Sequence, residues 1–355
     1  MLFSIIAVVT LLSSLSTDNN IHRQVCPDGG YVLVDGNNEL VAVSHASAIA
    51  SDSVGPLLDP IAFGQGYPYN MYCPYDTTGR QCVTGCVATA MAQIMAYHQW
   101  PNHCLSGSVS FSTPAVPSVL NMSFDTVTLD WMNILPTYAG VESTEEQKKA
   151  IAILMKSCGY AAKMEYSSSG SGTYSTAVSS SLMSIFNYRN SVEGSAGLLS
   201  IEKMSEFTNV TYFQNALIAE IDAKRPVYAS GTNSSEYVAL GWDGAHAFVI
   251  DGYCYAKDDV KKRYPFFHFN WGWNGSTGGI GTLWFRLQAD NICPYYAGMD
   301  IIRGITPNRT TPLEEIKEDF WEEQDNRIFD LMGREIAMPV QGQIYIQHGK
   351  KFIAQ

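Results

Sequence analysis

The chain has 355 residues, of which 46% are hydrophobic and 16% are charged, so it can bury one large core or two smaller ones. Its formal net charge is −12, and Lys and Arg form no long run. This balance excludes the basic surface by which proteins bind nucleic acid or anionic membranes. The sequence therefore indicates a folded globular protein with neither as a partner.

Residues 1–17 begin with an apolar run that ends in small residues, as in the h-region of a secretory signal. The basic n-region of such a signal is missing, so an anchor or a different start site stays open as an alternative. The run of about 15 residues is short for a membrane-spanning helix, and we expect no stable membrane span elsewhere. Eight cysteines fit an oxidising compartment, but their spacing predicts neither a metal site nor a disulfide framework.

Residues 18–53 are predicted to precede the main domain. Two short strands around an Asp-Gly-Asn-Asn turn are predicted between Asp28 and Ser44, as a hairpin by itself. The Ala- and Ser-rich piece from Ser44 to Ser53 has few large apolar residues, which is typical of a linker open to proteolytic cutting. We therefore place the main domain at residues 54–307.

A loop rich in turn formers and aromatic rings is predicted from Pro56 to Tyr75. Gln65 lies between two glycines in this loop, so its side chain can extend into a cleft. An amide N–H is the kind of donor that an oxyanion hole requires. The alternative is that Gln65 is a surface turn residue.

A helix is predicted to begin at Cys86 and to run to His98, because apolar residues recur at helical spacing and Pro101 follows. The unsatisfied N–H groups of a helix N-terminus favour a thiolate, so we expect the pKa of Cys86 to be lowered and its sulfur to be nucleophilic. Thr84 is the predicted N-cap, and Gly85 leaves the sulfur uncovered. The alternative is that Cys86 is a small buried hydrophobic residue.

The middle of the chain is predicted to hold short strands, then a helix opened by a capping box at Thr144 that buries Cys158. The Ser- and Gly-rich stretch from Glu165 to Ser175 is too short to link domains, so we predict an ordered loop beside the cleft. Helical spacing predicts two more helices, at residues 176–188 and 211–223, and strands dominate after them.

An almost unbroken apolar run after His246 predicts a buried strand, and Phe266 to Trp271 predicts its partner. If the hairpin between them turns near Asp258, His246 pairs with Asn270 at the open end. An imidazole held by an amide oxygen has a fixed tautomer and can act as a base toward a thiol. The alternatives are a core histidine with satisfied hydrogen bonds and a turn asparagine leading into Gly272.

Four blocks of this sequence resemble the streptopain-like cysteine peptidases of family C10, in the family's order. They are Gln65-Gly66-Tyr67-Pro68-Tyr69-Asn70 with Cys73-Pro74, Thr84 to His98, Gly244 to Tyr253, and Asn270-Trp271-Gly272-Trp273. The resemblance spans roughly Pro56 to Thr306. It implies a papain-like α+β fold in which a helical half carries the cysteine and an antiparallel β half carries the histidine.

The resemblance also implies roles for these residues. By it, Cys86 is the nucleophile, His246 is the base and later the acid, and Gln65 is the oxyanion donor. Asn270 would orient His246, and the Trp271 indole would shield that contact. The loop from Tyr166 to Ser171 would line the substrate cleft, with substrate-binding residues at Ser169, Gly170, Ser171 and Ala245. Neither a cofactor nor a metal is needed for this chemistry.

Two departures from the family pattern stand out. The family usually carries Trp two residues before the oxyanion Gln, and Phe63 occupies that position here. The family also has a much longer inhibitory prodomain, whereas Asp28 to Ser44 is similar to its last hairpin only. Residues 18–53 would then be a short remnant of a prosegment with its linker.

The C-terminal region begins with a charged, Pro-led stretch that predicts a linker at residues 308–326. Residues 327–355 resemble the β-rich C-terminal tails of exported Bacteroidetes proteins, which implies a sorting or surface-attachment segment and contact with a secretion machinery. A spare hairpin module is the alternative.

Together these features predict a bacterial cysteine endopeptidase, secreted or at the cell surface, that acts on proteins or peptides through a Cys86 thiolate and His246. Two other functions stay open. One is a catalytically inactive surface-binding protein on the same fold, and the other is an acyltransferase that passes the acyl group to an amine instead of water.

Overall fold

The computed structural model describes residues 22–25, 31–35, 40–44, 52–232, 244–257, 263–275, 283–287, 293, 295–309, 328–329, 335–336, 341, 344–347 and 350–353. The chain divides into two compact units, Met1–Pro307 and Asn308–Gln355. The signal-like residues 1–17 and the linker predicted at 308–326 lie almost wholly outside the described residues. Among the described helices, none has both the length and the apolar character needed to cross a membrane.

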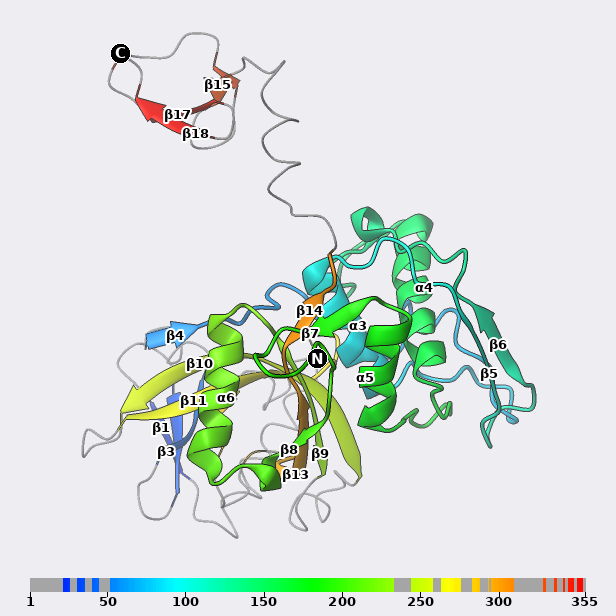
Figure 1. The fold of residues 1–355 in the computed structure, drawn as a ribbon, viewed down its shortest axis with the longest axis horizontal. Coiled ribbons are helices and arrows are strands. Elements are labelled where there is room, and N and C mark those ends of the chain that lie inside the picture. Colours follow the sequence, from blue (N-terminus) through cyan, green and yellow to red (C-terminus); the bar gives the residue numbers. More distant parts are fainter. Residues whose placement is uncertain are drawn as a thin grey trace. The chain divides into compact units, whose positions relative to one another are not determined.

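The first unit has a helical half and a β half, which lie side by side in Figure 1. In the helical half, α3 packs against both α4 and α5 around a core that includes Met91, Leu154 and Leu182. The elements of this half are α3 (Cys86–His98), β5 (Ser108–Phe111), β6 (Leu120–Ser123), η1 (Trp131–Asn133), α4 (Glu145–Ala161) and α5 (Ser175–Ser184).

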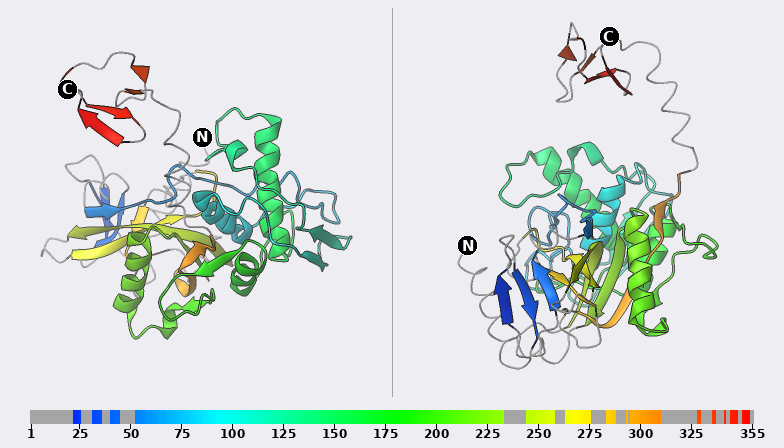
Figure 2. Two further views of the ribbon diagram at one scale, coloured as in Figure 1. Left: turned by 45° about the horizontal axis from the view of Figure 1, so that its top comes forward. Right: turned by 90° about the vertical axis from the view of Figure 1, so that its left-hand side faces the viewer.

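The β half is one large antiparallel sheet with the strand order β1-β2-β3-β12-β11-β10-β9-β13-β8, and β4 also pairs with β10. Helix α6 (Val210–Asp222) packs on one face of β9 and β10, while α3 packs on the other face, as the views of Figure 2 show. The strands are β1 (His22–Val25), β2 (Tyr31–Val34), β3 (Leu40–Ser44), β4 (Asp52–Val54), β8 (Glu202–Lys203), β9 (Val227–Thr232), β10 (Ala245–Lys257), β11 (Arg263–Asn270), β12 (Leu283–Phe285) and β13 (Ala297–Ile302), with η2 (Met204–Glu206) after β8.

Helix α3 has the predicted span, but its N-cap is Gly85 and not Thr84. Gly85 has φ 86° and ψ 149°, a conformation that a side chain would strain. The Thr84 hydroxyl is 3.1 Å from that of Thr89, so it does not cap the helix. The helix ends at Gln99, which is left-handed, just before Pro101.

Local signals elsewhere predicted the elements well. The capping box at Thr144 is present and opens α4, and Cys158 is fully buried. The strands expected after α3 are the hairpin of β5 and β6. Helix α5 is shorter than predicted because the chain leaves it at Ile185 and forms β7 (Tyr188–Asn190), which pairs with β14 (Ile305–Pro307).

The predicted N-terminal hairpin is formed by β2 and β3, but it does not stand by itself. Strand β3 pairs with β12, so that Ser44 lies opposite Leu283. Of the linker predicted from Ser44 to Ser53, residues 45–51 lie outside the described residues, and its end forms β4 on the edge of β10. The hairpin is therefore part of the same sheet as β10 and β11.

The predicted pairing of His246 with Asn270 is wrong. Strands β10 and β11 do form a hairpin, but Asn270 lies opposite Val249, and His246 lies opposite Gly231 on β9. The register also shifts between Ile250 and Gly252, which marks a bulge at Asp251. Lys257 pairs with Arg263, so the register is centred further along the chain than the one predicted from a turn near Asp258.

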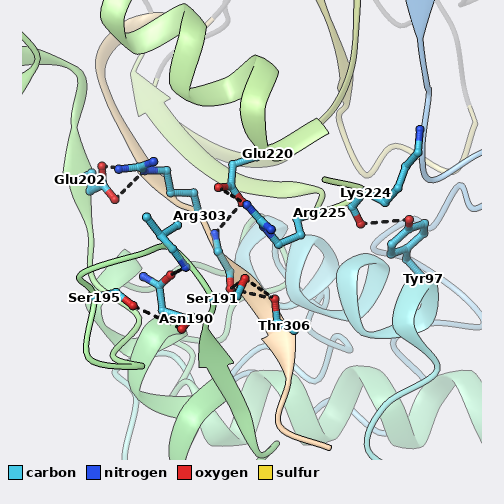
Figure 3. A network of polar contacts seen from close by, with 12 residues as sticks. Tyr97, Asn190, Ser191, Ser195, Glu202, Glu220, Lys224, Arg225, Arg303 and Thr306 are labelled. Carbon is cyan, nitrogen blue, oxygen red and sulfur yellow. Dashed lines mark hydrogen bonds and ion pairs between the residues drawn. The ribbon is translucent and has the colours of Figure 1, made fainter. Parts of the chain in front are cut away.

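A buried charge network fastens α6 to the last strands of the first unit (Figure 3). Glu220 is 1% exposed, and its carboxylate accepts two hydrogen bonds from Arg225, at 2.7 and 2.8 Å, and one from the Gly304 N–H. Glu202 pairs with Arg303 in the same region, where both side chains are 23% exposed. The first pair lies at the end of α6 and buries only its carboxylate, since Arg225 is 24% exposed, whereas the second pair joins β8 to the residue after β13.

Replacing Glu220 by Gln is expected to cost about 2 kcal/mol of unfolding free energy, because the buried amide would face donors on both sides, the Gly304 N–H and the partly exposed Arg225 guanidinium. Glu202→Gln is the matched control and should cost less than about 1 kcal/mol, since its pair is hydrated. Urea unfolding of both variants measures the difference. Equal losses would contradict the role of burial.

The second unit is described for only a few residues, which form an antiparallel sheet of order β16-β15-β17-β18. Its strands are β15 (Ile328–Phe329), β16 (Glu335–Ile336), β17 (Ile344–Gln347) and β18 (Lys350–Ile353). They fall within residues 327–355, where a β-rich tail was predicted.

Candidate active site

Cys86 is the first residue of α3, so its sulfur lies at the helix N-terminus as predicted. The backbone N–H of Ala247, the residue after His246, lies close enough to the sulfur to act on its pKa. Burial raises the pKa of the Cys86 thiol, and the N–H groups of Ala247, Val87 and Cys86 itself oppose this only in part. The expected lowering of this pKa is therefore wrong, because desolvation outweighs the helix terminus.

His246 lies at the open end of β10 and is 7% exposed. Its Nε2 lies 2.8 Å from the backbone carbonyl oxygen of Trp271. A carbonyl only accepts, so Nε2 carries the proton and Nδ1 keeps its lone pair. Burial lowers the pKa of His246 to about 4, although the Trp271 carbonyl acts in the opposite direction. At neutral pH the ring is thus a neutral base with one defined tautomer.

Aromatic rings enclose the imidazole. Its centroid lies 4.9 Å from that of Tyr295, 5.2 Å from Trp273 and 6.2 Å from both Trp271 and Phe248. This surrounding explains the burial that keeps His246 neutral. The Trp271 indole was predicted to shield a contact between Asn270 and His246, and that contact is not formed. The contributions of Trp273 and Tyr295 were not predicted, because neither residue stands out by spacing in the sequence.

Asn270 does not hold the imidazole directly, contrary to the prediction. Its Nδ2 donates to the carbonyl oxygen of Ile61 at 2.8 Å, and its Oδ1 accepts from the Gly272 N–H at 3.2 Å. The acceptor for His246 is the Trp271 main chain instead. Because a backbone carbonyl carries no residue-type signal, the sequence could not have identified it.

Gln65 lies beside the helix N-terminus as the oxyanion prediction requires. Its carbonyl oxygen accepts from the Thr84 N–H at 3.1 Å, two residues before Cys86. Upstream, the Phe63 N–H donates to the side-chain Oε1 of Gln93 at 3.1 Å, and the Phe63 carbonyl accepts from the Asn274 N–H at 2.7 Å. The loop therefore contacts both the cysteine helix and the chain that follows β11.

Gln93 was missed by the sequence reasoning, although a signal was present. It lies on α3 and is fully buried, among the apolar residues that predicted the helix. A polar residue in that position must find partners inside the protein. Its Oε1 finds the Phe63 N–H, and its Nε2 has no hydrogen-bond partner among the described residues.

The loop predicted to line the cleft lies against the residues before Cys86. The Val83 N–H donates to the Ser167 carbonyl at 3.2 Å, and the Ser171 hydroxyl donates to the Val83 carbonyl at 2.8 Å. Ser171 also accepts from the Ser167 N–H, so its hydroxyl already has partners within the protein. Ser169, Gly170 and Ala245 are exposed.

The geometry brings a free thiol, a neutral imidazole of defined tautomer and an amide-bearing loop to one place at the junction of the two halves. A cysteine and a neutral histidine on two elements that pack together are the groups that nucleophilic catalysis on acyl groups requires. Residues 63–280, which include all of these groups, match the Peptidase C10 family. The chain belongs to this family. Its papain-like α+β fold is therefore confirmed.

Curated relatives support the same assignment. Streptopain of Streptococcus pyogenes is 36% identical over 279 residues, which are 74% of this chain and 63% of the relative. The thiol protease/hemagglutinin PrtT of Porphyromonas gingivalis is 32% identical over 235 residues, or 64% of this chain and 24% of the relative. The match thus spans less than two thirds of the length of these relatives.

Solved structures show the same fold. The active interpain A cysteine protease of Prevotella intermedia superposes with a TM-score of 0.55 and 30% identity, over 71% of this chain and 94% of that chain. A prointerpain A fragment gives 0.58 at 23% identity, over 82% of this chain and 99% of that chain. The chain is therefore similar to both in architecture.

Proposed function

We propose that the chain is a cysteine endopeptidase that hydrolyses peptide bonds in proteins or peptides through Cys86 and His246. The observation that carries this proposal is the packing of α3 on β10 with the Ala247 N–H close to the Cys86 sulfur, because Ala247 directly follows the residue that supplies the base. Family membership supports the same chemistry.

In the first step, the Cys86 sulfur attacks the peptide carbonyl carbon while its proton passes to Nδ1 of His246, since Nε2 is occupied by the Trp271 carbonyl. The resulting oxyanion accepts hydrogen bonds from the Gln65 side-chain amide and from the Cys86 N–H, which has no acceptor within the helix. His246 then gives its proton to the leaving amine, and the C–N bond breaks.

The product of this step is a thioester between Cys86 and the acyl half of the substrate. Water attacks that thioester while His246 takes a proton from it, and the acid leaves as the thiol is restored. The exposed Ser169, Gly170 and Ala245 flank the site and contact the bound peptide, whereas the Ser171 hydroxyl shapes the loop.

We assign the chain to the cell exterior, because residues 1–17 have the apolar character of a secretory signal. Residues 18–53 act as a short prosegment with its linker, and maturation cuts the chain between Ser44 and Ser53. Residues 327–355 act in sorting or surface attachment.

The full chain should be treated with an epoxide-type thiol inhibitor and then examined by mass spectrometry. We expect a single label on Cys86 and a mature N-terminus between Ser44 and Ser53, and we expect protein that was not treated with the inhibitor to cleave bonds inside a long peptide. Absence of both label and cleavage would favour an inactive binding protein. Amide products in place of acids when an amine is added would indicate an acyltransferase.

A further inference from the structure

The peptide group between Trp271 and Gly272 is held from both sides. Its carbonyl oxygen accepts from His246 Nε2 at 2.8 Å, and its N–H donates to Asn270 Oδ1 at 3.2 Å. Because C=O and N–H belong to one rigid plane, the bond to Asn270 fixes the direction of the carbonyl that holds the imidazole. Asn270 therefore acts on His246 indirectly, through the peptide group between Trp271 and Gly272.

The Nδ2 end of the Asn270 side-chain amide contacts the segment that leads to Gln65. Asn270 Nδ2 donates at 2.8 Å to the carbonyl oxygen of Ile61, four residues before Gln65. The amide can satisfy both partners in only one orientation, since Ile61 offers an acceptor and Gly272 offers a donor. One side chain thus bridges the peptide group that orients the base and the segment that carries the proposed oxyanion donor.

Gln93 fixes that segment at a second point. It is fully buried on α3, and its Oε1 accepts from the Phe63 N–H at 3.1 Å, two residues before Gln65. Gly272 touches the same helix: a Cβ on it would meet the Thr89 side chain at 2.9 Å, and its φ is +69°. The loop after β11 and the loop before Gln65 therefore share α3 as their support.

We propose that Asn270 is a positioning residue that couples the base to the oxyanion hole, and that Gln93 is a second positioning residue that acts on the oxyanion donor alone. This inference rests on the proposed function, in which His246 is the base and Gln65 the donor. The role of Asn270 is indirect, because the imidazole hydrogen-bonds to the Trp271 carbonyl and not to the Asn270 side chain.

Two reactions of the full chain separate the two effects. Alkylation of Cys86 by iodoacetamide needs a reactive thiolate beside His246 but forms no oxyanion. Acylation by a peptide ester needs both the thiolate and the oxyanion hole. The ratio of the two rates therefore reports the position of Gln65, and the pH profile of alkylation reports the position of His246.

Gln93→Met should slow acylation about 10-fold and leave the rate and pH profile of alkylation unchanged. Asn270→Leu should slow acylation about 10- to 100-fold and also move the rise of alkylation toward higher pH, because a freed and better hydrated imidazole keeps its proton to higher pH and acts as a base only above it. Met95→Leu is the matched control: Met95 is also fully buried on α3 but contacts Cys158, so both reactions should keep their wild-type rates.

The proposal makes a further prediction for the Gln65→Ala background, which lacks the side-chain amide of the oxyanion hole. In that background, Gln93→Met should not slow acylation further, while Asn270→Leu should still shift the pH profile of alkylation. Independent losses that multiply in the Gln65→Ala, Gln93→Met double variant would overturn the role of Gln93. An unchanged alkylation profile in Asn270→Leu would overturn the coupling.

Asn270→Ala replaces Asn270→Leu if the latter does not fold, and the Gln93 variant is independent of both. Failure of the proposed function would look different. If Gln65→Ala left the acylation rate unchanged, the assignment of Gln65 as oxyanion donor would be wrong. If Gln65→Ala slowed acylation but Gln93→Met did not, only the positioning role of Gln93 would be wrong.

Discussion

Replacing Cys86 by Ala is expected to lower kcat/KM for peptide cleavage by about 10⁴-fold or more, because no other group can form the thioester. The fold should survive, since Cys86 is the first residue of α3 and is only partly buried. A fluorogenic peptide measures activity, and urea unfolding measures stability.

Cys158→Ala is the matched control for the Cys86 variant. Cys158 is fully buried on α4 and packs against Met95, so its loss should reduce stability and leave kcat/KM near the wild-type value. Activity of Cys86→Ala within about tenfold of wild type would show that another residue is the nucleophile.

Replacing His246 by Ala is expected to lower kcat/KM by about 10³-fold or more, since the thiol then lacks a base. The wild-type enzyme should also show a shifted pH profile. Burial lowers the pKa of His246 to about 4, and the base must be neutral. Activity should therefore persist as the pH falls below 6.5 and be lost near pH 4. In the variant this acidic limb should disappear.

The control for this second substitution is His103→Ala. His103 is exposed, and its Nδ1 lies 3.0 Å from the Thr128 hydroxyl, so both the rate and the pH profile should match the wild type. Measurements of kcat/KM from about pH 4 to 9 decide the matter. An acidic limb near pH 6.5 in the wild type would show that His246 is hydrated and not enclosed by aromatic rings.

Part of the site could be predicted because it depends on local signals. Helical spacing predicted the element that carries Cys86, and the capping box at Thr144 predicted the start of α4. The turn formers around Gln65 predicted a loop, and no helix or strand forms there. These signals act within a few residues of each other, so a single sequence contains them in full.

Other features depended on how distant segments meet. The pairing of His246 was mispredicted because a hairpin register depends on the position of its turn and on bulges such as the one at Asp251. The pKa of Cys86 was predicted in the wrong direction because its burial by β10 and its neighbours is a tertiary effect, which a helix N-terminus alone cannot reveal.

The sequence by itself determined the chemistry: a cysteine at the start of a helix, a histidine at the start of an apolar strand and a glutamine in a Gly-rich loop. The tertiary structure decided how these groups are held. The Trp271 carbonyl, the bond from Asn270 to Ile61 and the buried Gln93 connect residues that are 25 to 209 positions apart. Backbone groups accept and donate in every residue type, so only the folded chain shows which of them orient the site.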